Sequence, residues 1–153
     1  MSVPNRQVRG SAANCFTSVE ICRLALVAAG RASQHERAYS AAVAAANAGQ
    51  LLRDVVRPAD LVARLGGDEF AVWLDGADEL TAAERAERLR MEAPHRLSSG
   101  LPDPDAVLTA SVGIACRSGR CGEEADEVIR RADLAMREVK HAGGGHWRVC
   151  HGN

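Results

Sequence analysis

The pattern of apolar and polar positions predicts a long helix followed by a hairpin in the middle of the chain. Seven of the eleven residues from Ala38 to Ala48 are alanine, the strongest helix former. The helix should end at about Arg57, because Pro58 disfavours helix at the residue before it. Two apolar runs follow at 61–65 and 70–74, with a Gly-Gly-Asp-Glu turn between them. This arrangement predicts an antiparallel β-hairpin.

The pattern continues with two further helices and two strands. Thr81-Ala82-Ala83-Glu84 has the form of a capping box, which predicts that a helix begins there. That helix should end at about Glu92, before Ala93-Pro94. The three glycines at 143–145 should end the last helix. The later elements are a strand, a helix and a short final strand, expected at 107–115, 123–142 and 147–150.

The first 34 residues show little helical or strand periodicity. We therefore expect a divergent or disordered segment over 1–34 and a folded part over 35–150. The apolar run Leu24–Ala29 is the exception, and it fits either a short buried strand or a piece of helix. Periodicity does not decide between these two alternatives.

Composition limits the classes of partner. Nineteen Lys and Arg against twenty Asp and Glu give a net charge of −1, which provides no attraction for nucleic acid. Two Trp, two Phe and one Tyr are also too few for a surface that stacks bases. No apolar run approaches the roughly 18 residues of a membrane helix. Five irregularly spaced cysteines make a poor disulfide framework and indicate a reducing, cytoplasmic location.

The predicted hairpin turn carries the candidate chemistry. Gly66 and Gly67 allow the backbone to approach a ligand closely and to present N–H groups to an anion. Asp68 and Glu69 offer hard oxygen ligands for Mg²⁺, and Arg64 could neutralise charge on a phosphoryl group. The alternative is that the glycines only form the turn and the acids only keep it soluble. Chemistry alone favours that alternative, because short motifs recur by chance.

The exact string Arg-Leu-Gly-Gly-Asp-Glu-Phe at 64–70 resembles the signature of the GGDEF family, the diguanylate cyclases. The resemblance covers the chain from about Ala45 to Gly143. Three further segments follow the family pattern in the same order: Arg57-Pro-Ala-Asp60, Ala110-Ser-Val-Gly-Ile-Ala115, and Arg131-Ala-Asp-Leu-Ala-Met136 with Lys140 and Gly143 after it.

This resemblance implies a fold and a reaction. The fold would be α/β (α+β), a ferredoxin-like, nucleotide-cyclase-type antiparallel sheet with packed helices. Members of the family condense two GTP into cyclic di-GMP and two pyrophosphates with the help of Mg²⁺. Two domains meet face to face as a homodimer, and each domain holds one GTP. The implied partners are therefore GTP, cyclic di-GMP and a second copy of the domain.

The resemblance also implies roles for individual residues at the hairpin. Asp68 would be a metal ligand, and Glu69 is the second acid of the signature. Arg64 would lie near the reacting phosphates, while Lys140 would reach the triphosphate. The glycines that would line the nucleotide are Gly66 and Gly67.

A second implied site would bind the product. Arg57 and Asp60 stand where the family carries an inhibitory R-x-x-D site for cyclic di-GMP. Arg88 stands where the family often adds another arginine to that site. The structural alternative for Arg57 and Asp60 is a salt bridge at the end of a helix.

The first part of the chain departs from the family pattern. The central strand of the family normally carries a metal-binding aspartate, which an ungapped count places near Ala25. The residues that read guanine would fall near Ser33 and Ala42. The first strand is therefore degenerate or replaced, for example by Leu24–Ala29, which contains no acid. In the last helix Arg137 replaces the usual tyrosine.

These departures leave three hypotheses for function. With one acid in place of a convergent pair, the chain should hold Mg²⁺–GTP poorly and be a weak or inactive cyclase. Alternatively, it is an inactive receptor that binds cyclic di-GMP through Arg57 and Asp60. The third alternative is a non-functional truncated or frame-disrupted relic.

Overall fold

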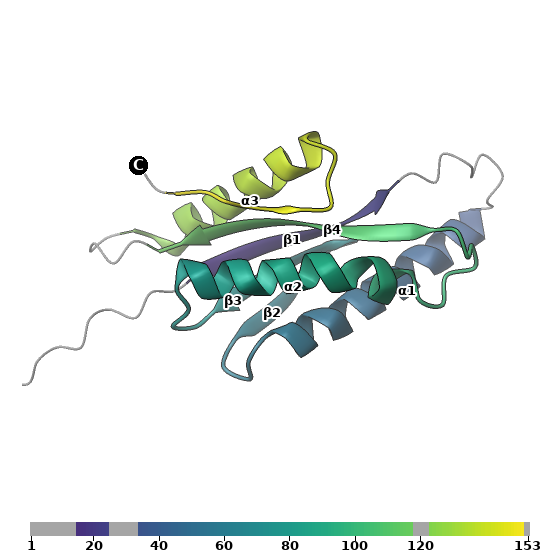
Figure 1. Cartoon of the computed structure of the whole chain (residues 1–153), viewed down its shortest axis with the longest axis horizontal. Helices are drawn as coiled ribbons and strands as arrows, with labels where there is room; N and C mark the ends of the chain where they lie inside the picture. The colour runs from purple at the N-terminus through teal and green to yellow at the C-terminus, as the bar shows by residue number, and fades with distance from the viewer. Residues whose placement is uncertain (1–14, 25–33, 118–122, 152–153) are drawn as a thin grey trace, which may run out of the picture.

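The computed structural model describes the backbone of residues 15–24, 34–117 and 123–151, and the side chains of the last two ranges. Within these residues five strands form one sheet in the order β2-β3-β1-β4-β5 (Figure 1). The strands are β1 Cys15–Leu24, β2 Leu61–Gly66, β3 Glu69–Leu74, β4 Val107–Cys116 and β5 Trp147–Val149. The helices are α1 Gln34–Val55, α2 Glu79–Ser98 and α3 Ala125–His141.

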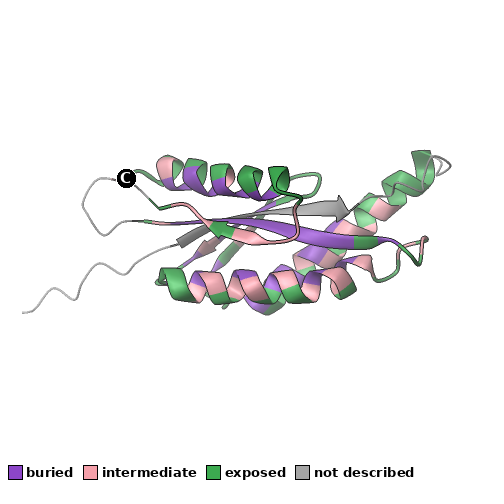
Figure 2. Ribbon diagram, turned by 45° about the horizontal axis from the view of Figure 1, so that its top comes forward, coloured by how far each residue is buried: buried purple, intermediate pink, exposed green. Residues whose placement is uncertain are grey.

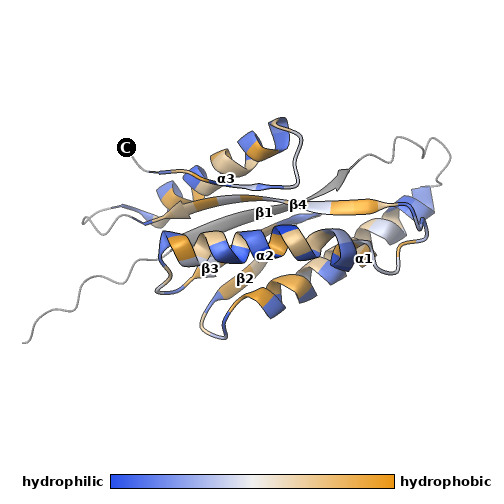
Figure 3. Ribbon diagram, viewed as in Figure 1, coloured by the Kyte–Doolittle hydropathy of each residue, from blue (hydrophilic) through white to orange (hydrophobic). Residues whose placement is uncertain are grey.

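The helices cover both faces of the sheet. Figures 1 and 2 show α1 and α2 on one face and α3 on the other. The larger core lies under α1 and α2, where Leu51, Leu89 and Leu97 pack with alternate residues of β3 and β4. A smaller core lies under α3 around Val128 and Ala132. β4 contributes to both cores, and its length is buried and largely apolar in Figures 2 and 3.

The central strand comes from the segment expected to be divergent. β1 pairs antiparallel with β3 on one side and with β4 on the other. The strand spans Cys15–Leu24, so it shares only Leu24 with the run 24–29 suggested as its replacement, and 25–29 lie outside the described residues. Aromatic and β-branched residues, among them Phe16, Thr17, Val19 and Ile21, favour strand at 15–24, whereas alanines dominate 25–29.

The prediction for α2 was wrong at both ends. The helix begins at Glu79 rather than at Thr81, because the carboxylate of Asp78 is the N-cap and accepts from the backbone N–H of Thr81 at 2.8 Å. It continues through Pro94 to Ser98. Leu97 explains the continuation, because its side chain is 1% exposed and packs in the larger core. Tertiary packing therefore outweighs the local cost of proline.

The other predicted elements are confirmed, with ends that differ by no more than two residues. The hairpin forms from β2 and β3, and the last helix ends before Gly143, which has a φ of 108°. β5 pairs in parallel with β4 and completes the sheet. Cys116 is disulfide-bonded, contrary to the expectation from cysteine spacing. None of the helices described here is long and apolar enough to cross a membrane.

Candidate functional site

The tip of the β2–β3 hairpin brings the signature residues together. The register of the two strands shifts between Arg64 and Gly66, and the turn lies at Gly67 and Asp68. The Arg64 side chain folds over this turn and donates to the carbonyl oxygen of Gly67 from Nε at 3.1 Å and from Nη2 at 2.6 Å. Asp68 and Glu69 are exposed. A guanidinium and two carboxylates therefore lie beside the same short turn.

The two glycines of the turn are not required by the fold. Neither Gly66 nor Gly67 has a φ in the left-handed range that favours glycine. A Cβ atom added at either position would meet nothing within 4 Å. The alternative in which the glycines only form the turn therefore has no support in the backbone conformation. What the glycines provide is open space next to Asp68.

A cavity of about 510 Å³ adjoins the turn. Arg64, Gly67 and Asp68 line it on the hairpin side, and the first half of α1 lines it opposite. Its size lies within the range of small-molecule sites, roughly 300–1,000 Å³. Its remaining lining combines Arg37 and Ser40 with small and apolar side chains: Ala38, Ala41, Ala42, Ala44, Ala45, Leu101 and Leu108. Cationic groups beside an apolar wall suit a ligand that has both phosphate and an apolar ring.

The structure does not bring Lys140 to this cavity. Lys140 lies in the last turn of α3, on the other face of the sheet from α1, and is not among the described residues that line the cavity. The implied contact of Lys140 with a triphosphate therefore stays a prediction. Arg37, at the start of α1, is the lining cation that the sequence did not single out. The available signal was weak: Arg37 lies four residues before Ala41, so the two share one face of an alanine-rich helix.

The sequence also missed an acid in the central strand. In the β1–β3 register Glu20 stands directly opposite Glu69. We expected a central strand without an acid because we assigned it to Leu24–Ala29. That expectation was wrong, because the strand spans Cys15–Leu24 and contains Glu20. Glu20 is the only acidic residue among the first 34, which was the signal that could have found it. Among the described side chains, no group of three His, Cys, Asp or Glu is gathered for a metal ion.

Asp60, the acid expected at the inhibitory site, is buried and already has partners. Its carboxylate accepts from the backbone N–H of Arg57 at 2.7 Å and of Asp75 at 3.0 Å, and it forms an ion pair with Arg85. Burial alone would raise the pKa of Asp60, but these hydrogen bonds outweigh it and hold the pKa below its ordinary value. The salt bridge suggested between Arg57 and Asp60 is thus replaced by one between Arg85 and Asp60.

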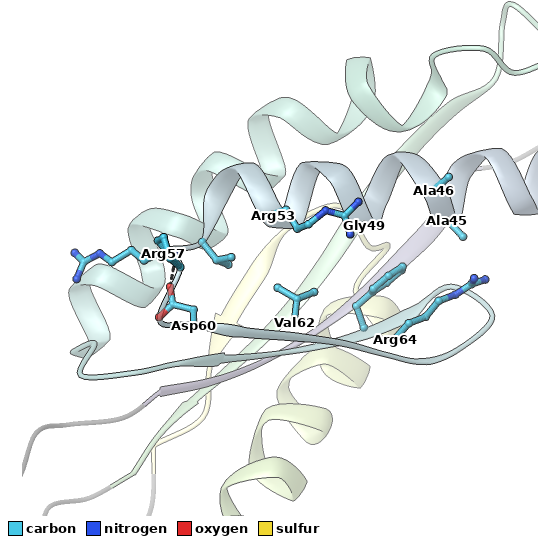
Figure 4. A pocket seen from close by; sticks show the side chains of 11 residues that line it. Ala45, Ala46, Gly49, Arg53, Arg57, Asp60, Val62 and Arg64 are labelled. Atoms are coloured by element: carbon cyan, nitrogen blue, oxygen red, sulfur yellow. Dashed lines mark hydrogen bonds between the residues drawn. The ribbon is translucent and has the colours of Figure 1, made fainter.

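The two arginines expected at the inhibitory site are exposed. Figure 4 shows the Arg57 side chain pointing outward from the turn, while only its backbone N–H is bonded to Asp60. Arg88 donates to the carboxylate of Glu92 at 2.7 Å and to the carbonyl oxygen of Asp54 at 3.3 Å. Both guanidiniums therefore reach solvent, whereas the Asp60 side chain is only 1% exposed.

Comparison with known proteins agrees with the fold and the hairpin. The family model for "Diguanylate cyclase, GGDEF domain" matches residues 45–146. Among solved structures, the GGDEF domain of DgcB from Caulobacter crescentus in complex with c-di-GMP superposes with a TM-score of 0.70. That comparison covers 90% of this chain and 78% of the other at 21% identity, so it shows the fold. The chain belongs to the GGDEF family and has its nucleotide-cyclase-type fold.

Curated relatives are longer proteins. The chain is 36% identical over 94 residues to the bifunctional diguanylate cyclase/cyclic di-GMP phosphodiesterase MucR of Pseudomonas aeruginosa, covering 60% of this chain and 13% of MucR. It is 38% identical over 109 residues to the diguanylate cyclase TpbB of the same species, covering 68% of this chain and 24% of TpbB. The chain thus spans less than a quarter of the length of either relative.

Proposed function

We propose that this chain holds Mg²⁺–GTP at the hairpin tip and serves cyclic di-GMP signalling as a weak or inactive diguanylate cyclase. The observation that carries the proposal is the open space at Gly66 and Gly67 beside Asp68 and a cavity of about 510 Å³. Because the turn does not need glycine for its own conformation, close approach of a ligand is the remaining reason for two glycines there. The names of TpbB and MucR support the same reaction.

The donor set at the tip fits magnesium only in part. Asp68 offers a hard carboxylate oxygen, and Glu69 follows it in the chain; such oxygens suit Mg²⁺, which usually binds to one or two carboxylates and to phosphates of the substrate. When bound, the metal would neutralise phosphate charge. Glu20, opposite Glu69 in the sheet, is our candidate for a second carboxylate from the central strand.

The other residues of the tip would position the nucleotide. Arg64 is held at the turn by its two hydrogen bonds to Gly67, which fix its guanidinium beside the cavity. An arginine held in this way can face phosphate oxygens with its remaining N–H groups. Arg37 would face the same phosphates from α1. In a homodimer, the second copy would bring the other GTP, whose 3′-hydroxyl attacks the α-phosphorus as pyrophosphate leaves.

Weak activity follows from the missing guanine contacts. Ala42 lines the cavity at the place where the resemblance expects a residue that reads guanine. A methyl group makes no hydrogen bond, so the site loses both affinity and the ability to select guanine. The expected contact near Ser33 lies outside the described residues.

Calorimetric titration of the chain with Mg²⁺–GTP tests the proposal. We expect weak binding that Asp68→Asn reduces by about tenfold, because one charged metal ligand is removed. Glu138→Gln, which changes an exposed acid on α3, is the matched control and should bind as the unchanged chain does. No heat of binding from a folded sample, or equal loss in both variants, contradicts the proposal.

Cyclic di-GMP binding without synthesis is the second candidate function. The exposed guanidiniums of Arg57 and Arg88 favour it, together with the solved complex of DgcB with c-di-GMP. Because the carboxylate of Asp60 is buried, only the two arginines would contact the ligand. Titration with cyclic di-GMP should then show binding that Arg57→Ala weakens and Asp68→Asn leaves intact. Binding of neither nucleotide by a folded sample would favour a relic.

A further inference from the structure

The strand β2 forms one edge of the sheet and leaves two large apolar side chains exposed. It stands last in the order of the described strands, so one of its backbone edges has no strand partner there (Figure 1). Val62 and Arg64 face the cavity beneath α1. Because side chains alternate along a strand, Leu61, Ala63 and Leu65 lie on the other face of the sheet. Leu61 is 67% exposed and Leu65 is 62% exposed, since α3 packs over β1, β4 and β5 instead.

β2 lacks the features that usually keep edge strands from pairing. Native edge strands are very short or carry lysine, proline or other charged residues. The strand at the opposite edge, β5, has three residues and carries the exposed, charged Arg148. β2 has six residues and contains neither lysine nor proline. Its one charged side chain, Arg64, is turned back onto the carbonyl oxygen of Gly67. This edge is therefore open to another strand.

The sequence of β2 is complementary to itself in an antiparallel pair. A twofold axis at Ala63 would place this residue opposite Ala63 of a second copy and Leu61 opposite Leu65 of that copy. The four leucines then meet on one face of the joined sheet. Each covers a side chain that the single chain leaves exposed, and this burial of apolar surface would drive the association.

The charges at the two ends of β2 fit the same axis. Arg57 precedes the strand, and its exposed guanidinium has no carboxylate partner among the described residues. Asp68 follows the strand and is an exposed acid without an ion pair in the same part of the chain. The axis brings the hairpin tip of each copy beside the turn at 57–60 of the other, so Arg57 and Asp68 face each other twice. This reciprocal charge complementarity favours a second copy over an unrelated strand.

We propose that two copies of this chain pair antiparallel along β2 and form one continuous sheet. A single strand buries less than the roughly 1,200–2,000 Å² of a stable interface, so this dimer should be weak and depend on concentration. It differs from the catalytic homodimer of the proposed function, because the two hairpin tips lie at opposite ends of the paired strands. It needs neither GTP nor Mg²⁺, and its test is independent of nucleotide binding.

Sedimentation equilibrium of the full chain, in EDTA and without nucleotide, tests the proposal. We expect a monomer–dimer equilibrium between micromolar and millimolar concentrations of chain. Leu61→Lys should raise the dissociation constant by about tenfold or more, because it places a charge in the apolar contact. Leu80→Lys is the matched control, since Leu80 is 68% exposed on α2, and it should associate as the unchanged chain does. A chain that stays monomeric throughout, or equal losses in the two variants, overturns the proposal.

A cysteine at the twofold axis tests the register of the two strands. Opposite residues of an antiparallel pair have Cα atoms about 4.5–5.5 Å apart, which is the spacing of a disulfide. Mild oxidation of Ala63→Cys should therefore cross-link two copies rapidly. Leu80→Cys adds an exposed thiol elsewhere and is the control for cross-links through the native cysteines. Pairing about Ala63 is overturned if the two variants cross-link at the same rate.

Reversal of charge tests the contact between Arg57 and Asp68. Arg57→Glu and Asp68→Lys should each weaken the dimer by about two- to tenfold, because each places like charges opposite one another. The double variant exchanges the two charges and should associate about as well as the unchanged chain. A double variant that associates no better than either single variant overturns this contact.

Discussion

At the scale of single residues, Gly113 sets how closely α3 approaches the sheet. A Cβ at this position would overlap the carbonyl oxygen of Ala132 and the amide nitrogen of Met136, both backbone atoms of α3. The glycine in the Ser-Val-Gly-Ile-Ala segment is therefore a packing requirement. Gly66 and Gly67 are the opposite case, since open space surrounds them. Glycines that look alike in the sequence thus have different surroundings: packing requires Gly113, whereas it requires neither Gly66 nor Gly67.

Gly113→Ala should destabilise the protein by about 1–3 kcal/mol or more, because helix and strand must move apart to accept the added methyl group. Gly66→Ala, with nothing within 4 Å of its Cβ, is the matched control and should unfold almost as the unchanged chain does. Urea denaturation followed by circular dichroism measures both. Equal midpoints for the two variants would show that α3 does not pack as described.

Asp60 should make stability depend on pH. Its folded pKa lies below the unfolded value of 3.8, so its ionised form stabilises the fold at pH values above 3.8. That contribution should decline as the pH falls below 3.8 and the carboxylate takes up a proton. Asp60→Asn should cost about 3 kcal/mol at pH 7, because it leaves Arg85 without its charge partner.

The difference between the unchanged chain and Asp60→Asn should therefore be full at neutral pH and shrink below about pH 4. Denaturant unfolding at a series of pH values measures it. A difference that stays constant down to pH 3 would contradict a depressed pKa for Asp60.

At the scale of elements, α2 shows what local pattern reveals and what it hides. The Thr-Ala-Ala-Glu segment predicted the presence of the helix, but Asp78 caps it three residues earlier than the capping box suggested. The end of the helix depends on the burial of Leu97 against residues distant in sequence. A residue pattern predicts the periodic middle of a helix well, whereas its ends are decided by single hydrogen bonds and by packing.

Asp78→Ala should destabilise the protein by about 1 kcal/mol, because the N–H of Thr81 loses its acceptor. Asp78→Ser should recover most of that loss, since serine is also a good N-cap. Thermal unfolding of the three proteins at neutral pH is the measurement. If Thr81→Ala instead had the larger effect, the capping box would be the true start of the helix.

At the scale of the whole molecule, sequence reasoning predicted the hairpin, β4 and α3, because each is encoded by its own residues. It did not place β1, whose position depends on pairing with β3 and β4 far along the chain. The candidate site was predicted at Arg64 and Asp68 from the signature string. Arg37 was missed, because its part in the cavity follows from how α1 lies on the hairpin.

The order of strands in the sheet also bears on how the chain folds during synthesis. Of the five described strands β1 leaves the ribosome first, yet the backbone of Cys15 pairs in the sheet with that of Cys116, which is made 101 residues later. At about 5–20 residues per second, that interval lasts roughly 5–20 s. Throughout it, the strand that will occupy the middle of the sheet has at least one edge without a partner. A nascent chain that paused before residue 107 would therefore expose this edge to other strands, and we expect holding chaperones to be needed at that stage.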